Sequence, residues 1–178
     1  MKKNSLLIWI FCGLSFIGFA QKRADYLLTL KQDTLYGKVL TASNGLAPIQ
    51  FVYGGHRMNY YPTSIQFFGV FRDNNYRHFK TLRSRRGQAF FVEIMVNDYM
   101  KLYKYKEEHI NYKTTTIRYV YLVGPSDDKL TVLSSSTFQS TLGKFLKEKP
   151  NMLTALKETT FHELPQLIRH YNELYREL

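Results

Sequence analysis

The sequence has almost no cysteine: its 178 residues include one, Cys12. A single cysteine excludes an internal disulfide, a Cys-x-x-Cys redox pair and a cluster of thiolate metal ligands. Cys12 lies in an apolar N-terminal run, so cleavage after that run leaves no thiol at all. The fold then depends on its apolar core, and a chain of this size buries roughly 68–70% of its unfolded surface. A single domain over residues 21–178 is expected.

Long apolar runs are also lacking beyond the N-terminus. Lys2 and Lys3 precede an uncharged apolar stretch that extends from residue 5 to Ala20. Small residues then precede Gln21 at a position that fits signal peptidase. Residues 1–20 are therefore predicted to be a signal peptide that is cleaved between Ala20 and Gln21. The expected location is outside the cytoplasm of a Gram-negative bacterium, in the periplasm or at the outer membrane.

Two alternatives for the leader are less well matched. A retained membrane anchor needs about 20 apolar residues, and this shorter run is interrupted by Gly13, Ser15 and Gly18. A lipid-modified cysteine needs a small residue before it, whereas Phe11 precedes Cys12. We therefore expect cleavage and no transmembrane segment in the processed chain.

Acidic residues are scarce. The chain has 25 Lys and Arg against 14 Asp and Glu, a formal net charge of +11, which falls to about +9 when Lys2 and Lys3 leave. Within one segment six basic residues face a single acid, Asp73, and they are the first candidate binding residues: Arg72, Arg77, Lys80, Arg83, Arg85 and Arg86. Export argues against nucleic acid, so an anionic glycan or lipid surface or an envelope protein is the expected partner. The alternative is a solvated loop that only keeps the protein soluble.

Strand patterns dominate the first three quarters of the chain. Residues 26–70 alternate apolar and polar positions between short turns, which predicts a β-meander. Residues 72–88 are polar and predicted to be mainly loop, with a short strand candidate at 79–82. Residues 89–96 and 99–106 flank Asn97-Asp98 and predict a two-residue hairpin. Further strands at 115–123 and 129–133 complete β-hairpins over 89–133.

The hydrophobic period changes from two to about 3.6 after residue 135. Ser136 and Gln139 have the spacing of a helix-capping pair, and apolar residues then recur on one helical face as far as Pro150. Two further amphipathic segments follow, so residues 136–177 are predicted to form two or three helices. Strands followed by helices predict an α+β fold with an antiparallel sheet.

Catalytic signatures are weak. The five histidines are scattered, without the short spacing of a metal site, and neither a Gly-x-Ser-x-Gly elbow nor a phosphate-binding glycine loop occurs. No catalytic residue, metal or cofactor is therefore predicted. Glu93, Asp33 and Asp98 are the acids that a glycan hydrolase could use. A cell-wall or glycan hydrolase thus remains the alternative to a non-enzymatic binding module.

Aromatic residues are abundant, at 16% of the chain. Tyr60 and Tyr61 are candidate binding residues, because together with Phe67, Phe68 and Phe71 they are able to form a surface on which a sugar or peptide stacks. The alternative is that these rings fill the core.

Two resemblances concern the strand segments. The stretch from Leu28 to Val39 resembles the opening of small SH3-like barrels, a likeness confined to residues 26–70. More broadly, the chain resembles a group of uncharacterised exported proteins from Bacteroidota. It shares with them an Asp33-Thr34-Leu35-x-Gly37 strand pair, a Tyr61-Pro62-x-x-Ile65 segment and a late Tyr171-Asn172. This resemblance implies export and a similar architecture, and it implies no activity. The sequence thus predicts an exported, non-enzymatic binding or scaffolding module.

Overall fold

The computed structural model describes residues 24–42, 45–111 and 114–176, and of residues 108–111 it describes the backbone alone. The predicted signal peptide, the cleavage site at Ala20 and Gln21 and Cys12 lie outside these residues. The strands are β1 (Asp25–Thr29), β2 (Thr34–Thr41), β3 (Ile49–Tyr53), β4 (His56–Tyr60), β5 (Ile65–Arg72), β6 (Asn75–Arg83), β7 (Ala89–Val96), β8 (Lys101–Asn111), β9 (Thr114–Gly124) and β10 (Thr131–Leu133). The helices are α2 (Phe138–Leu146), α3 (Pro150–Glu158), the 3-10 turn η2 (Phe161–Glu163) and α4 (Leu164–Arg176).

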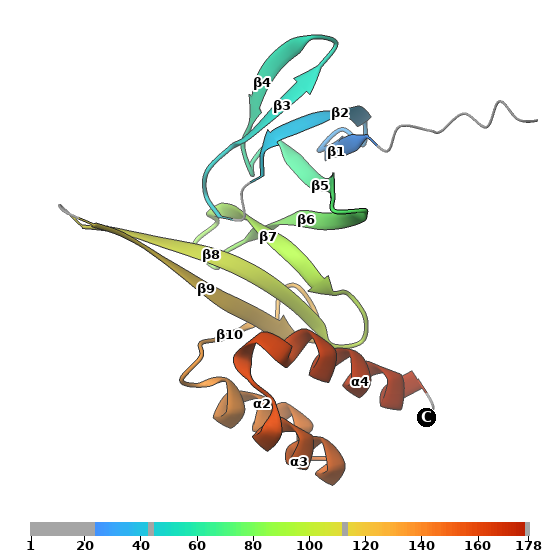
Figure 1. Ribbon diagram of the computed structural model, residues 1–178, viewed down its shortest axis with the longest axis vertical. Coiled ribbons are helices and arrows are strands. Elements are labelled where there is room, and N and C mark those ends of the chain that lie inside the picture. The colour runs from blue at the N-terminus through green and yellow to red at the C-terminus, as the bar shows by residue number, and fades with distance from the viewer. Residues whose placement is uncertain (1–23, 43–44, 112–113, 177–178) are drawn as a thin grey trace, which may run out of the picture.

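The ten strands form one sheet in the order β10-β9-β8-β7-β6-β5-β1-β2-β3-β4. Every pairing between neighbours is antiparallel. In Figure 1 the helices gather at one end of the molecule and the hairpin β3–β4 lies at the other. The predicted α+β class, a β-rich N-terminal and central part followed by helices, is confirmed. The likeness of residues 26–70 to SH3-like barrels stays a prediction.

The prediction of a loop at 72–88 is wrong for most of its length, because β6 runs through the middle of it. Asp73 and Asn74 both have positive φ, 49° and 63°, which is the backbone of the tight turn that joins two antiparallel strands. The sequence of β6 looks polar because Arg77 occupies the same side of the strand as Phe79, where it pairs with Glu93 on β7. That ion pair hid the apolar alternation of the strand.

The hairpin between β7 and β8 also differs from its prediction. Its loop has four residues, 97–100, and the register shifts between Ile94 and Val96. The shift moves Val96 away from Ile94 and Tyr103 and places it in the cluster under the helices with Leu102. The longer loop is fixed by Asn172 of α4, whose side chain accepts a bond from the Met100 backbone N–H (2.8 Å) and donates one to its carbonyl (2.9 Å).

Two apolar clusters lie on one side of the sheet, which we call the closed face. The first joins Ile49 and Phe51 of β3 to Phe79 of β6 and Phe91 of β7, although four strands separate β3 from β7 in the sheet order. The sheet therefore curls around these side chains. A hydrogen bond of 2.8 Å from the Phe91 backbone N–H to the carbonyl of Gly45, in the β2–β3 connection, holds the curl.

The second closed-face cluster lies beneath the helices. Leu102 and Val123 of β8 and β9 pack against Leu142 of α2, Met152 of α3 and Ile168 of α4. These residues belong to the apolar stripes predicted from the sequence, so the three helices and their buried faces are confirmed. Each helix is short, and the burial of its stripe against the sheet and its neighbours is what stabilises it.

The predicted cap at Ser136 is wrong. The residue at the N-cap of α2 is Thr137, and its side chain makes no capping bond. Gln139 turns to α3, where its side-chain amide donates to the carbonyls of Leu156 and Lys157. The reciprocal cap appears instead at η2, between Thr160 and Glu163. Gln139 thus bonds carbonyls at the C-terminal end of a neighbouring helix, a contact that sequence spacing does not reveal.

Candidate functional site

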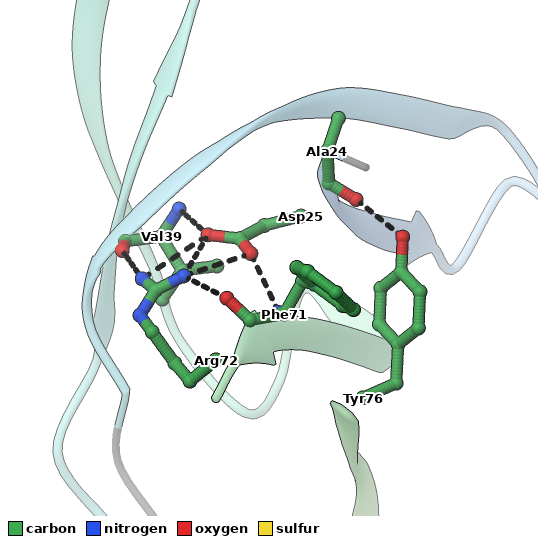
Figure 2. A network of polar contacts seen from close by, with 6 residues as sticks. All are labelled: Ala24, Asp25, Val39, Phe71, Arg72 and Tyr76. Carbon is green, nitrogen blue, oxygen red and sulfur yellow. Dashed lines mark hydrogen bonds and ion pairs between the residues drawn. The ribbon is translucent and has the colours of Figure 1, made fainter. Parts of the chain in front are cut away.

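Arg72, the first basic candidate, is part of a clamp at the start of β1. The carboxylate of Asp25, 4% exposed, accepts bonds from the backbone N–H groups of Val39 and Phe71, both at 2.8 Å. The Arg72 guanidinium pairs with the same carboxylate at 3.1 Å and donates to the carbonyl of Val39 at 2.8 Å. Figure 2 shows these contacts converging from β1, β2 and β5. This geometry ties three strands together and uses the charge of Arg72 in doing so.

Arg77 is also engaged. Its Nε and Nη2 donate to the two oxygens of Glu93 at 2.7 and 2.8 Å, the bidentate geometry that makes such pairs strong. This hydrogen bond raises the pKa of Arg77. Glu93, the acid on which the hydrolase alternative depends most, therefore faces an arginine.

Lys80 and Lys101 bind Asp127 from β6 and β8. The hydroxyl of Tyr103, whose side chain is fully buried, donates to the same carboxylate at 2.6 Å. Burial, and then this bond, raise the pKa of Tyr103 far above its usual value. Burial acts to raise the pKa of Asp127, but the bonds from Lys80 and Tyr103 outweigh it and lower that pKa. The cluster fixes the β9–β10 loop against the sheet.

Asp127 and Asp128 line a cleft of about 660 Å³ together with Lys80 and Arg83. A glycan hydrolase of the usual type needs one protonated carboxylic acid, which requires a raised pKa. A hydrogen bond from Ser126 lowers the pKa of Asp128, and that of Asp127 is lowered too. These two acids are therefore ionised at neutral pH and do not form an acid–base pair.

The remaining three basic candidates gather at one place. Arg83 ends β6, and Arg85 and Arg86 follow in the turn to β7; all three are exposed. In the part of the chain that the structure describes, no acid pairs with them. We call residues 83–86 the basic turn. Two bonds between Ser84 and Gln88 and one from Gly87 N–H to the Ser84 carbonyl hold its backbone.

The aromatic candidates Tyr60 and Tyr61, at the end of β4, lie in different surroundings. Tyr60 packs on the closed-face cluster, with its ring edge-on to Phe51 at 6.1 Å. Tyr61 is 54% exposed, and its carbonyl accepts bonds from the backbone and hydroxyl of Ser64. The two rings thus do not form one stacking surface.

A different set of rings lies on the opposite side of the sheet, which we call the open face. Tyr36, Tyr26, Gly69 and His78 are direct cross-strand neighbours on β2, β1, β5 and β6. A side chain at position 69 would meet the Tyr26 ring, 2.3 Å from its Cε1 atom. The glycine therefore lets Tyr26 cross β5 and bring its hydroxyl within 3.1 Å of His78 Nδ1.

A cavity of about 430 Å³ lies over this row of residues. Its walls are aromatic side chains, one leucine and one threonine: Tyr26, Leu28, Thr34, Tyr36, Phe67, Tyr76 and His78. Burial lowers the pKa of His78, while burial followed by the nearby tyrosines raises that of Tyr26. Both side chains are therefore neutral at pH 7, and the Tyr26 hydroxyl and His78 Nδ1 share a hydrogen bond. The cavity shares Leu28 and Phe67 with the cleft beside Asp127.

No sequence pattern predicted that Tyr26, Tyr36, Tyr76 and His78 form a group. Tyr76 and His78 alternate with Arg77 along β6, so a strand assignment at 75–83 places them on one face. The contact with Tyr26 depends on the register across Gly69, which no local pattern contains. The signal was therefore partly present, in a segment interpreted as a loop.

The described residues offer neither a metal site nor a membrane-spanning helix. No group of three or more His, Cys, Asp or Glu residues there could hold a metal ion. None of the described helices is both long and apolar enough to cross a membrane. Comparison of the chain with family models, curated proteins and solved structures finds no match.

Proposed function

We propose that this chain is a non-enzymatic binding module of the bacterial envelope, and that it attaches to an anionic glycan or lipid surface through the basic turn. The observation that carries this proposal is that some of the candidate basic side chains are paired with acids and the others are not. Arg72, Arg77 and Lys80 are neutralised by acids within the fold. Arg83, Arg85 and Arg86 instead lie exposed on one turn.

The basic turn suits a surface that carries many negative groups. Its three guanidiniums lie within four consecutive residues on a backbone fixed by hydrogen bonds. A basic side chain close to an anionic membrane contributes about 1 kcal/mol of binding free energy. Three of them together give about 3 kcal/mol, roughly a hundredfold in affinity. The net charge of the processed chain, which falls from +11 to about +9 when Lys2 and Lys3 leave, acts in the same direction.

The pairing of the acids supports the non-enzymatic part of the proposal. Glu93 is paired with Arg77, Asp98 with Arg176, and Asp127 with two lysines. The proposal of export rests on the leader predicted at residues 1–20, which also supplies the envelope location.

The test is a binding assay on the processed chain, residues 21–178, carrying Arg83→Gln, Arg85→Gln and Arg86→Gln together. Two probes separate the possible sources of negative charge: phosphatidylglycerol vesicles present lipid phosphate, and polygalacturonate presents glycan carboxylate. A matched control removes three exposed lysines from the helices, with Lys144→Gln, Lys147→Gln and Lys157→Gln. Affinity is measured at two ionic strengths, because screening weakens exposed charge pairs.

We expect the arginine variant to bind one of the probes about a hundredfold more weakly than the unmodified chain and to lose most of the salt dependence. The lysine control keeps an affinity within about threefold of the unmodified chain. Equal losses in the two variants would show that net charge alone matters, and the basic turn would lose its role. Binding to neither probe, with a protein recovered from envelope extract instead, would replace the anionic surface with a protein partner.

A further inference from the structure

We propose that the open-face cavity is a binding site for an uncharged pyranose ring of a glycan. The cavity has a volume of about 430 Å³, within the range of about 300–1,000 Å³ that is usual for ligand pockets. It lies on β2, β1, β5 and β6, away from the helices, and Tyr36 and Tyr76 at its rim are 66% and 37% exposed. This inference rests on the cavity alone and does not depend on the basic turn.

The rings of the cavity are arranged for stacking. Phe67 lies 5.7 Å from His78 with 27° between the planes, and Tyr76 lies 5.8 Å from His78 with 12° between them. Tyr26 is 6.0 Å from Phe67 at 28°. Phe67, Tyr76 and His78 thus have similar plane orientations, whereas Tyr26 is tilted from Tyr76 by 60° and from His78 by 55°. The flat C–H face of a pyranose packs on such ring faces, as other apolar surfaces do.

The polar atoms of the cavity are neutral. Thr34 and Tyr36 contribute hydroxyl groups, and the second ring nitrogen of His78, Nε2, adds a further polar atom beside the bond that Nδ1 shares with the Tyr26 hydroxyl. Among the residues that the structure describes, no lysine, arginine or carboxylate belongs to the lining. A ligand with one apolar face and several hydroxyl groups matches this lining, whereas a charged group would be desolvated there without a counter-ion. The chemistry therefore favours an uncharged sugar.

The platform is formed before any ligand binds. Tyr26 is held between the backbone of β5 at Gly69 and the imidazole of His78 on β6. A ring that is already fixed loses little conformational freedom on binding, and this lowers the cost of association.

An extended peptide fits this place less well. The strands β2, β1, β5 and β6 each have a neighbour on both sides, so their backbone groups are already paired and a further strand cannot be added there. A proline-rich helix is the remaining peptide mode, because it docks on aromatic side chains without strand pairing. The experiment therefore includes one.

The experiment is an amide chemical-shift titration of residues 21–178 with cellotriose and with N,N′,N″-triacetylchitotriose, alongside a decaproline peptide. We expect saturable shifts at Tyr26, Gly69 and His78 with at least one of the two sugars. Tyr36→Ala and Tyr76→Ala should each weaken binding about tenfold, since each removes one stacking ring. Tyr53→Ala is the matched control: Tyr53 is also an exposed strand tyrosine, at 46%, and does not line the cavity.

Three outcomes overturn the proposal. The first is the absence of shifts at these amides with both sugars at tens of millimolar. The second is decaproline binding at the cavity while neither sugar binds. The third is an equal loss of affinity in the Tyr53 control. Preserved amide dispersion in each variant shows that it remains folded, so a loss of binding reports on the site. None of these outcomes bears on vesicle or polygalacturonate binding at the basic turn.

Discussion

Neighbouring aromatic residues on the two faces of strands β5 and β6 have different roles. On the closed face Phe68 and Phe79 stack at 4.5 Å with 2° between their planes, and both are at most 1% exposed. On the open face the preceding residues, Phe67 and His78, form a looser pair at 5.7 Å beside the open-face cavity. Alternation along a strand thus lets one pair of strands supply the core on one side and a ligand surface on the other.

The largest expected effect separates these faces directly. Phe68→Ala removes a ring packed against Phe79 and Phe91, and we expect the free energy of unfolding to fall by about 3–5 kcal/mol. The adjacent Phe67→Ala removes a half-buried ring and should cost less than about 2 kcal/mol. Urea unfolding of the two variants measures both values. Equal costs would mean that the open face is as much a part of the core as the closed face.

The next largest change in stability is expected from alanine substitutions at two glycines. At Gly69 an added methyl group would lie 2.3 Å from the Tyr26 ring, so Gly69→Ala forces Tyr26 out of place and should destabilise the fold by about 1–3 kcal/mol. At Gly143 in α2 the nearest atom is 4.0 Å away, in Leu153. Gly143→Ala should therefore be stabilising by up to about 1 kcal/mol, the gain in helix propensity. Thermal unfolding of the two variants shows whether the first is destabilised and the second stabilised. Destabilisation by both substitutions would contradict this account of Tyr26.

The pH dependence of stability sharpens the same comparison. Burial lowers the pKa of His78 in the folded state, so the unfolded chain binds the proton more strongly. Above the ordinary histidine pKa of about 6.5, His78 is neutral in both states and does not destabilise the fold. As the pH falls below that value, protons bind preferentially to the unfolded chain, and the free energy of unfolding decreases. The melting temperature should therefore drop less between pH 7 and 5 in His78→Gln than in the unmodified chain. Parallel curves for the two proteins would show that His78 is as solvated as a surface histidine.

The smallest expected effect is at the rim of the cavity. Tyr36 is 66% exposed, and Tyr36→Ala should change the free energy of unfolding by no more than about 0.5 kcal/mol. Urea unfolding measures this change, which is compared with the loss in free energy of unfolding caused by Phe68→Ala. A cost above about 2 kcal/mol would make Tyr36 a structural residue and remove it from the ligand surface.

Much of the fold follows from local pattern. The apolar stripes of α2, α3 and α4 repeat at helical spacing and are buried where the period places them. The strands of the first 70 residues alternate between clear turns, one of which has Gln32 at a φ of 70°. These elements were predictable because each periodicity is set by a single segment and the face that it buries.

The parts that were not predictable depend on contacts distant in sequence. Strand β6 was hidden because Arg77 is satisfied by Glu93, 16 residues away. The open-face row needs the register of four strands, and Tyr26 and His78 are 52 residues apart. The sequence offered six basic residues as one candidate set, and only the fold reveals that Arg72, Arg77 and Lys80 are already paired with acids. Local patterns carry no information on such pairings.

The most direct test of the proposed attachment is hydrogen–deuterium exchange of residues 21–178, free and bound to phosphatidylglycerol vesicles or polygalacturonate, whichever binds. The account predicts added protection of backbone amides in the basic turn, residues 83–86, and in the adjoining ends of β6 and β7. The amides of α2, α3 and α4 should exchange at unchanged rates. Protection confined to the helices, with none at the basic turn, would contradict the account.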